Sequence, residues 1–242
     1  MGYKSYPQRL ANALTTRRWD YVSIACGSLC SLLFLIALAI SGNIPPTAPW
    51  WDANRVHAHY WSHLKGTHAA SVFVMFSGAC YVVYSAALTR QIRRIPDIDP
   101  ILADIQLAGG AATFSVFMLG AVAMSLMTFR DYGPELTQLM NDIFYMATFL
   151  AWPIFLVQTW TVAWAIFSDK SPTPTLSRSM GLINLIAPVV YALGAGIHIH
   201  QTGPLAWNGG LVYWPTLVAF GFQINVDLWY IWKNLEASRP LP

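Results

Sequence analysis

The chain has 242 residues, of which 55% are hydrophobic and only 10% are charged, and its formal net charge is +3 at pH 7. A soluble domain carries about 25% charged residues, so this composition excludes an ordinary globular protein whose whole surface faces water. A bilayer solvates apolar side chains, and we therefore expect residues 1–242 to form a single transmembrane domain.

Six segments are long and apolar enough to cross a bilayer as helices, which takes about 20 residues each. They cover residues 21–42, 66–88, 105–128, 142–167, 180–199 and 210–232. The first exceeds the apolar core of a cleaved signal peptide, about 7–15 residues, so we expect it to be retained. The sequence thus predicts an all-α membrane protein with six transmembrane helices.

The connection between the first two segments is rich in aromatic residues. Residues 50–64 contain Trp50, Trp51, Tyr60 and Trp61, and such rings favour the headgroup level of a bilayer. We expect a short amphipathic helix here, lying on the outer surface before the second span.

Basic residues predict the orientation, because Lys and Arg collect on the cytoplasmic side of a membrane protein. With six spans, one side holds only three of the 14 basic residues: Arg55, Lys65 and Arg130. The termini and the second and fourth connections hold the rest. Both termini are therefore predicted to be cytoplasmic, which indicates a plasma (inner) membrane protein with its other face extracytoplasmic.

All six histidines fall near that extracytoplasmic face. In one helix, Asp52, His59 and His63 would share a face, and neutral imidazole binds copper, iron, zinc and nickel. His68 and His198 could instead be the axial ligands of a haem. The candidate metal site comprises Asp52, His59, His63, His68, His198, His200 and Asp142, with copper, iron, zinc or haem as cofactor. Solvated interface histidines and a pH-sensing role remain open alternatives.

Polar and helix-breaking residues inside the spans form a second group of candidates. Asp227 lies in the last span, and an ionisable group at membrane depth marks a functional hypothesis; it could equally pair with Lys233 near the inner end. Pro153 and Pro188 fall inside the fourth and fifth spans, where proline kinks a helix. Two kinked neighbours would open a pocket for an apolar molecule, or be ordinary bends.

Two motifs carry a family resemblance. Residues 134–142 read Pro-Glu-Leu-Thr-Gln-Leu-Met-Asn-Asp, and residues 202–209 read Thr-Gly-Pro-Leu-Ala-Trp-Asn-Gly. Together with the general plan, they resemble a family of small bacterial six-helix integral membrane proteins of unassigned function. The resemblance implies the fold and carries no activity or catalytic residues.

Three functions follow from these patterns. The first is a metal- or haem-binding protein with a redox or oxygenase-type role on a hydrophobic substrate or electron carrier. The second is a non-catalytic subunit or a module that binds a lipid or apolar ligand. The third is a small transporter using Asp227, against which the missing inverted repeat counts. Expected partners are the lipid bilayer, a hydrophobic small molecule or lipid, and a second copy or partner membrane subunit, but no nucleic acid.

Overall fold

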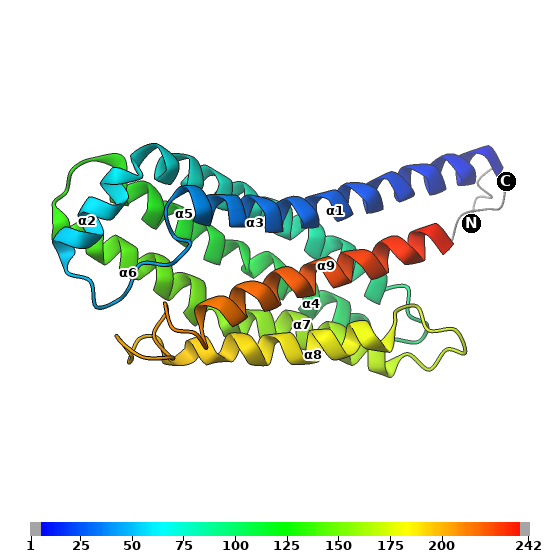
Figure 1. The fold of residues 1–242 in the computed structure, drawn as a ribbon. Coiled ribbons are helices and arrows are strands. Elements are labelled where there is room, and N and C mark those ends of the chain that lie inside the picture. The colour runs from blue at the N-terminus through cyan, green and yellow to red at the C-terminus, as the bar shows by residue number, and fades with distance from the viewer. Residues whose placement is uncertain (1–5, 238–242) are drawn as a thin grey trace.

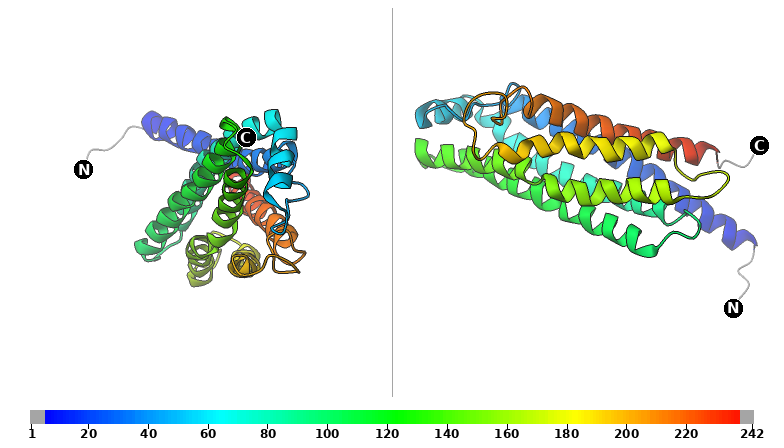
Figure 2. Two further views of the ribbon diagram at one scale, coloured as in Figure 1. Left: turned by 90° about the vertical axis from the view of Figure 1, so that its left-hand side faces the viewer. Right: turned by 90° about the horizontal axis from the view of Figure 1, so that it is seen from below.

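The computed structural model describes residues 6–237, and this part of the chain is helical with no strand. Its elements are α1 (Tyr6–Ile40), α2 (Ala53–Ser62), α3 (Leu64–Ile92), α4 (Pro100–Ala112), α5 (Phe114–Phe129), α6 (Pro134–Leu150), α7 (Trp152–Ser168), α8 (Arg178–Tyr191), the 3₁₀ turn η1 (Ala192–Gly196) and α9 (Tyr213–Ala237). The long helices run side by side along one axis (Figures 1 and 2).

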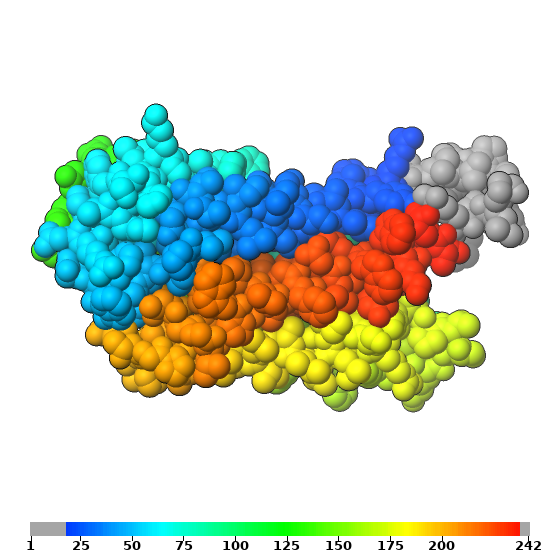
Figure 3. Space-filling view, viewed as in Figure 1, coloured from blue at the N-terminus to red at the C-terminus, as the bar shows by residue number. Residues whose placement is uncertain are grey.

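The helices form a closed ring. α1 packs against α3, α3 against α4 and α5, α5 against α6, α4 against α7, and α7 against α8. α9 packs against both α8 and α1 and so completes the ring. Figure 3 shows α1, α9 and α8 next to one another on one face. Short α2 packs mainly on α6.

Two of the predicted spans are interrupted helices. α4 and α5 meet at Thr113, whose hydroxyl donates to the carbonyl of Gly109 at 3.0 Å. α6 and α7 meet at Ala151, two residues before Pro153, which has no N–H to continue the helical ladder. The second break agrees with the predicted effect of Pro153, and the first was not predicted. Pro188 lies inside α8, which gives way to η1 after Tyr191.

Five helical segments of residues 6–237 are long and apolar enough to cross a membrane. They are Arg18–Ile40, Leu64–Ile92, Pro100–Phe129, Pro134–Ser168 and Arg178–Gly196. They match the first five predicted spans, although α1 begins at Tyr6 and the fourth span at Pro134, both earlier than expected. α9 has 25 residues but is not among the five; its polar Gln223, Asn225 and Asp227 interrupt the apolar run.

The ends of the bundle differ. α2 and the segment after α8 lie at one end, and α1 begins and α9 finishes at the other (Figure 1). We call these the α2 end and the opposite end. Large apolar side chains are exposed along the helices between them, including Phe76 (60%), Trp164 (68%) and Val218 (68%). Such exposure is compatible with lipid contact and unusual for a protein surrounded by water.

Ion pairs and hydrogen bonds join α1 to its neighbours at the opposite end. The carboxylate of Asp20 is 2% exposed and lies 3.0 Å from a guanidinium nitrogen of Arg90 and 3.3 Å from one of Arg94. The hydroxyl of Tyr21 donates to Glu236 of α9 at 2.7 Å. These contacts hold α1 against α3 and α9 where the hydrophobic ring ends.

Candidate functional site

The aromatic connection contains the short helix α2, and two of the candidate metal ligands meet at its C-terminal end. The rings of His59 and His63 lie 4.7 Å apart between centroids, as expected for positions i and i+4. Both rings lie against Gly42, where an added Cβ would come within 2.9 Å of either ring. The buried Nε2 of His59 has no hydrogen-bond partner, and Nδ1 of His63 is 2.9 Å from the carbonyl oxygen of His59.

The surroundings of His59 favour the neutral form of its ring. Burial first, and then the neighbouring His63, lower the pKa of His59 below its ordinary value. Neutral imidazole is the form that ligates metals. Asp52, however, is occupied as the N-cap of α2, where its carboxylate accepts from the backbone N–H of Arg55 at 2.9 Å.

The other candidate ligands lie apart from this pair. Nε2 of His68 is 3.2 Å from the carbonyl oxygen of Thr128; His198 and His200 are exposed after η1; and Asp142 accepts from Asn141 at 3.3 Å. Within residues 6–237 no three His, Cys, Asp or Glu side chains are grouped closely enough to hold a metal ion. The structure therefore brings together His59 and His63, and no larger ligand set.

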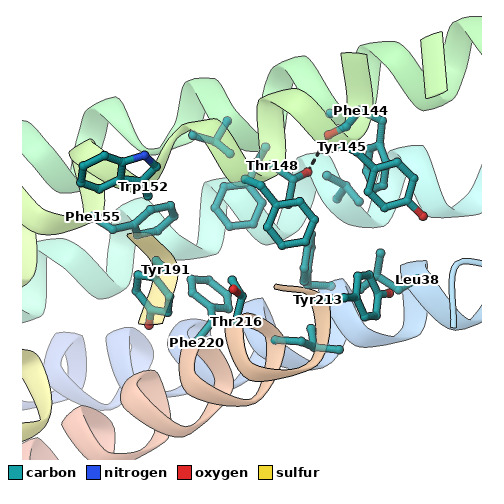
Figure 4. A pocket seen from close by; sticks show the side chains of 17 residues that line it. Leu38, Phe144, Tyr145, Thr148, Trp152, Phe155, Tyr191, Tyr213, Thr216 and Phe220 are labelled. Atoms are coloured by element: carbon teal, nitrogen blue, oxygen red, sulfur yellow. Dashed lines mark hydrogen bonds between the residues drawn. The ribbon is translucent and has the colours of Figure 1, made fainter. Parts of the chain in front are cut away.

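A cavity lies between the helices of the ring (Figure 4), and no histidine lines it. The cavity has a volume of about 80 Å³, which would hold roughly five to eight water molecules. Seven helices contribute to its wall. The lining residues are Phe34, Leu38, Val74, Val116, Phe117, Gly120, Phe144, Tyr145, Thr148, Phe149, Trp152, Phe155, Tyr191, Tyr213, Thr216, Leu217 and Phe220.

Few polar atoms are available within this wall. The hydroxyl of Thr148 donates a hydrogen bond to the backbone carbonyl of Phe144 at 2.7 Å. The hydroxyl of Tyr191 donates to Gln223, outside the lining, at 2.7 Å. Thr216 differs, because its buried Oγ1 has no hydrogen-bond partner. An apolar molecule with one hydrogen-bonding group fits this chemistry best.

A polar cluster closes the cavity at the α2 end. We call it the roof and define it as Asn43, Thr47, Tyr60, Asn141, Tyr145, Trp207 and Tyr213, all buried. Tyr145 donates to the side-chain oxygen of Asn43 at 2.8 Å and accepts from the backbone N–H of Thr47 at 3.1 Å. Tyr60 donates to Asn141 at 2.8 Å, and burial raises its pKa well above the ordinary value. The roof is therefore uncharged and joins the α1–α2 connection to α2 and α6.

The remaining roof residues bring in the connection before α9. Trp207 donates its indole N–H to the carbonyl of Thr47 at 2.8 Å and stacks on Tyr145, with centroids 5.0 Å apart. The hydroxyl of Tyr213 donates to the backbone carbonyl of Asn43. Segments separated by more than 150 residues are thus joined above the cavity.

Aromatic rings form the floor of the cavity. Phe155 packs edge-on against Tyr191, with centroids 5.7 Å apart, and against Phe220 at 5.8 Å. Tyr81 stacks on Phe220 at 6.1 Å and donates its hydroxyl to Gln158 at 2.7 Å. The floor separates the apolar space from a second set of buried polar groups.

This second set centres on Asp227, which is fully buried. Its two oxygens accept from the hydroxyl of Tyr84 and from the amide of Asn184, both at 2.7 Å. The chain of bonds continues from Gln223 to Asn184 at 3.1 Å and from Tyr191 to Gln223 at 2.7 Å. We call these five residues the Asp227 chain.

The alternative predicted for Asp227 is not observed. Lys233 is exposed and lies 5.2 Å from the ring centroid of Trp229, and no ion pair joins it to Asp227. Asn184 and Gln223 could be noted from the sequence as amides at membrane depth, but their connection to Tyr84 and Tyr191 could not. Comparisons with protein-family models, with curated proteins and with solved structures found no match to this chain.

Proposed function

We propose that this chain is an integral membrane protein of the bacterial inner membrane that binds an apolar small molecule or a lipid chain between its helices, without catalysis. The observation that carries the proposal is the cavity inside the ring, which is lined almost wholly by aromatic and aliphatic side chains. Apolar cavities stay dry and take up apolar molecules, and pockets between bundle helices are common ligand sites.

The proposal includes six spans with both termini cytoplasmic. Its support for the sixth span is the position of α9, which closes the ring between α8 and α1. Its support for the orientation is the distribution of Lys and Arg. With that orientation, α2 and the roof lie on the extracytoplasmic side, and the cavity lies at membrane depth.

The chemistry of the wall narrows the ligand. An unpaired hydroxyl in an apolar wall is costly, and a ligand with one hydroxyl or carbonyl removes that cost at Thr216. A charged ligand is disfavoured, because the cavity wall contains no charged side chain. We therefore expect a neutral molecule that places part of an alkyl chain in the cavity, such as an alkyl alcohol or one segment of a longer lipid.

A photoreactive alcohol tests this function directly. We would reconstitute the chain in lipid nanodiscs, add decanol bearing a diazirine, irradiate, and locate the labelled residues by mass spectrometry. Labelling of cavity residues that excess unlabelled decanol prevents is the expected result. Labelling confined to lipid-facing residues such as Trp164 would refute it.

Two substitutions on one helix provide a matched comparison. Leu217 lines the cavity, whereas its neighbour Val218 is 68% exposed and points away from the bundle. Leu217→Trp adds bulk inside the cavity and should lower the competed labelling by about tenfold or more, the loss expected for about 1.4 kcal/mol of binding energy. Val218→Trp adds the same bulk on the lipid side and should leave it unchanged.

The metal- or haem-dependent redox function stays a prediction with less support. Its favourable observation is the pair of His59 and His63, but a zinc site takes at least three protein ligands. Elemental analysis and an absorption spectrum would test it on the wild type beside His63→Ala and His198→Ala. A near-stoichiometric metal or a haem band that is lost in both variants would support it, and protein without either would rule it out.

A further inference from the structure

A fully buried acidic side chain lies beyond the floor of the cavity. Asp227 stands ten residues before the end of α9, which places it about 15 Å along the helix from that end. Its carboxyl group is therefore closer to the opposite end of the bundle than the cavity is, and it is separated from the cavity by the aromatic floor.

The groups around Asp227 are neutral. Tyr81 and Tyr84 face it from α3, and Tyr191 faces it from α8. On α1 the nearby position is Gly27, which lies against Leu228. Among the described residues, no Lys, Arg or His has a nitrogen within 4.0 Å of its oxygens.

Two opposed effects act on this carboxyl group. An unpaired negative charge is costly in a low-dielectric interior, and binding a proton removes that charge. The hydrogen bonds from Tyr84 and Asn184 stabilise the ionised form instead. A carboxyl group held between such effects can change its protonation state without a change of fold.

The bonds of the Asp227 chain have one direction. Tyr191 donates to Gln223, Gln223 donates to Asn184, and Asn184 donates to Asp227. On the other side of the carboxyl group Tyr84 donates to it as well. Asp227 is the final acceptor of both, so its charge orients every donor back to Tyr191, whose ring forms part of the cavity wall.

We propose that Asp227 is an exchangeable proton-binding site, and that its protonation is coupled through the Asp227 chain to occupancy of the cavity. A proton from the aqueous phase forms an O–H bond on the carboxylate oxygen that faces Tyr84, and the hydroxyl of Tyr84 rotates from donor to acceptor. Without the negative charge, the hydrogen bond from Asn184 to Asp227 weakens, and the bonds from Gln223 to Asn184 and from Tyr191 to Gln223 weaken in turn. The coupling rests on the proposed ligand binding, whereas the proton site stands without it.

Infrared difference spectroscopy in nanodiscs tests the proton site. The C=O stretch of a protonated carboxylic acid should appear as the pH is lowered from 9 to 5, disappear in Asp227→Asn, and persist in the control Asp142→Asn. Tyr84→Phe keeps the ring and removes one donor to the charged form, so it should move the midpoint upward by about one pH unit. A spectrum without a titrating band assigned to Asp227 would overturn the proposal.

The same titration with decanol present tests the coupling. We expect the midpoint in the wild type to shift on saturation with decanol, and the shift to vanish in Tyr191→Phe, which retains the cavity wall but cannot donate to Gln223. An unchanged midpoint in a protein whose cavity is labelled by the photoreactive decanol would refute the coupling alone. Absence of cavity labelling together with an intact Asp227 band would refute the ligand-binding function and leave the proton site standing.

Discussion

Removing the hydroxyl of Tyr145 should destabilise the protein more than removing any other single roof hydroxyl. This hydroxyl is both a donor, to Asn43 at 2.8 Å, and an acceptor, from the backbone N–H of Thr47 at 3.1 Å. Tyr145→Phe keeps the ring and its stacking on Trp207. The variant therefore isolates the two hydrogen bonds from the aromatic packing.

The magnitude follows from what is left behind. Asn43 can regain a donor, because the hydroxyl of Tyr60 lies 3.1 Å from its side-chain oxygen and Asn141 keeps the hydroxyl of Thr47 as its own donor. Thr47 is 0% exposed, so its backbone N–H would lose its partner inside the protein. A buried unsatisfied donor costs about 1–3 kcal/mol, and the lost bond to Asn43 adds about 1 kcal/mol. The expected loss in the free energy of unfolding is about 2–4 kcal/mol.

Unfolding of the detergent-solubilised protein by increasing SDS, followed by tryptophan fluorescence, measures this loss. Tyr213→Phe is the matched control, since it removes a single bond to the backbone carbonyl of Asn43 and should cost about 1 kcal/mol. If Tyr145→Phe lay within about 0.5 kcal/mol of wild type, or cost less than Tyr213→Phe, the reasoning about the unsatisfied Thr47 would be wrong.

Three further outcomes are expected. Thr216→Val removes the unpaired hydroxyl, so it should raise the free energy of unfolding of the ligand-free protein by about 1 kcal/mol. The same variant should lower cavity labelling by the diazirine-bearing decanol and leave cavity labelling by a diazirine-bearing alkane unchanged. Asp20→Asn should lower the free energy of unfolding in SDS by about 2 kcal/mol. The loss is smaller than for breaking a fully buried ion pair, because the side chain of Arg90 is 32% exposed. The lowered pKa of His59 means that the folded protein binds fewer protons than the unfolded chain below about pH 6.5. The contribution of His59 to stability is therefore complete above pH 6.5 and is lost as the pH falls toward the folded-state pKa. Between pH 7.5 and pH 5, the melting temperature should fall less for His59→Gln than for the wild type.

Composition and apolar runs predict the five helical segments that are long and apolar enough to cross a membrane, because a helix that faces lipid must be apolar along its length. α9 shows where this signal weakens: Gln223 and Asp227 face buried partners inside the ring, so the helix is less apolar than its position suggests. The break at Thr113 has no proline to announce it. The bond from its hydroxyl to the carbonyl of Gly109 does not mark the position either, because Thr159 and Thr161 make the same bond inside the continuous α7.

The candidate site was predicted only where it is local in sequence. Spacing along one helix correctly brings His59 to His63, because positions i and i+4 share a face. The cavity and the roof depend on contacts between distant segments, such as Thr47 with Asn141, 94 residues apart. Periodicity within one helix shows which side is apolar, but it does not show which rings from other helices will leave a space.

The two helix breaks have a mechanical consequence for the ligand. Since α5 packs on α6 and α4 packs on α7, the breaks at Thr113 and Ala151 fall at corresponding levels of neighbouring helices. A rotation of α5 and α6 about these breaks would require the bonds from Thr47 to Asn141 and Tyr145 to break, so the roof fastens this side of the cavity wall.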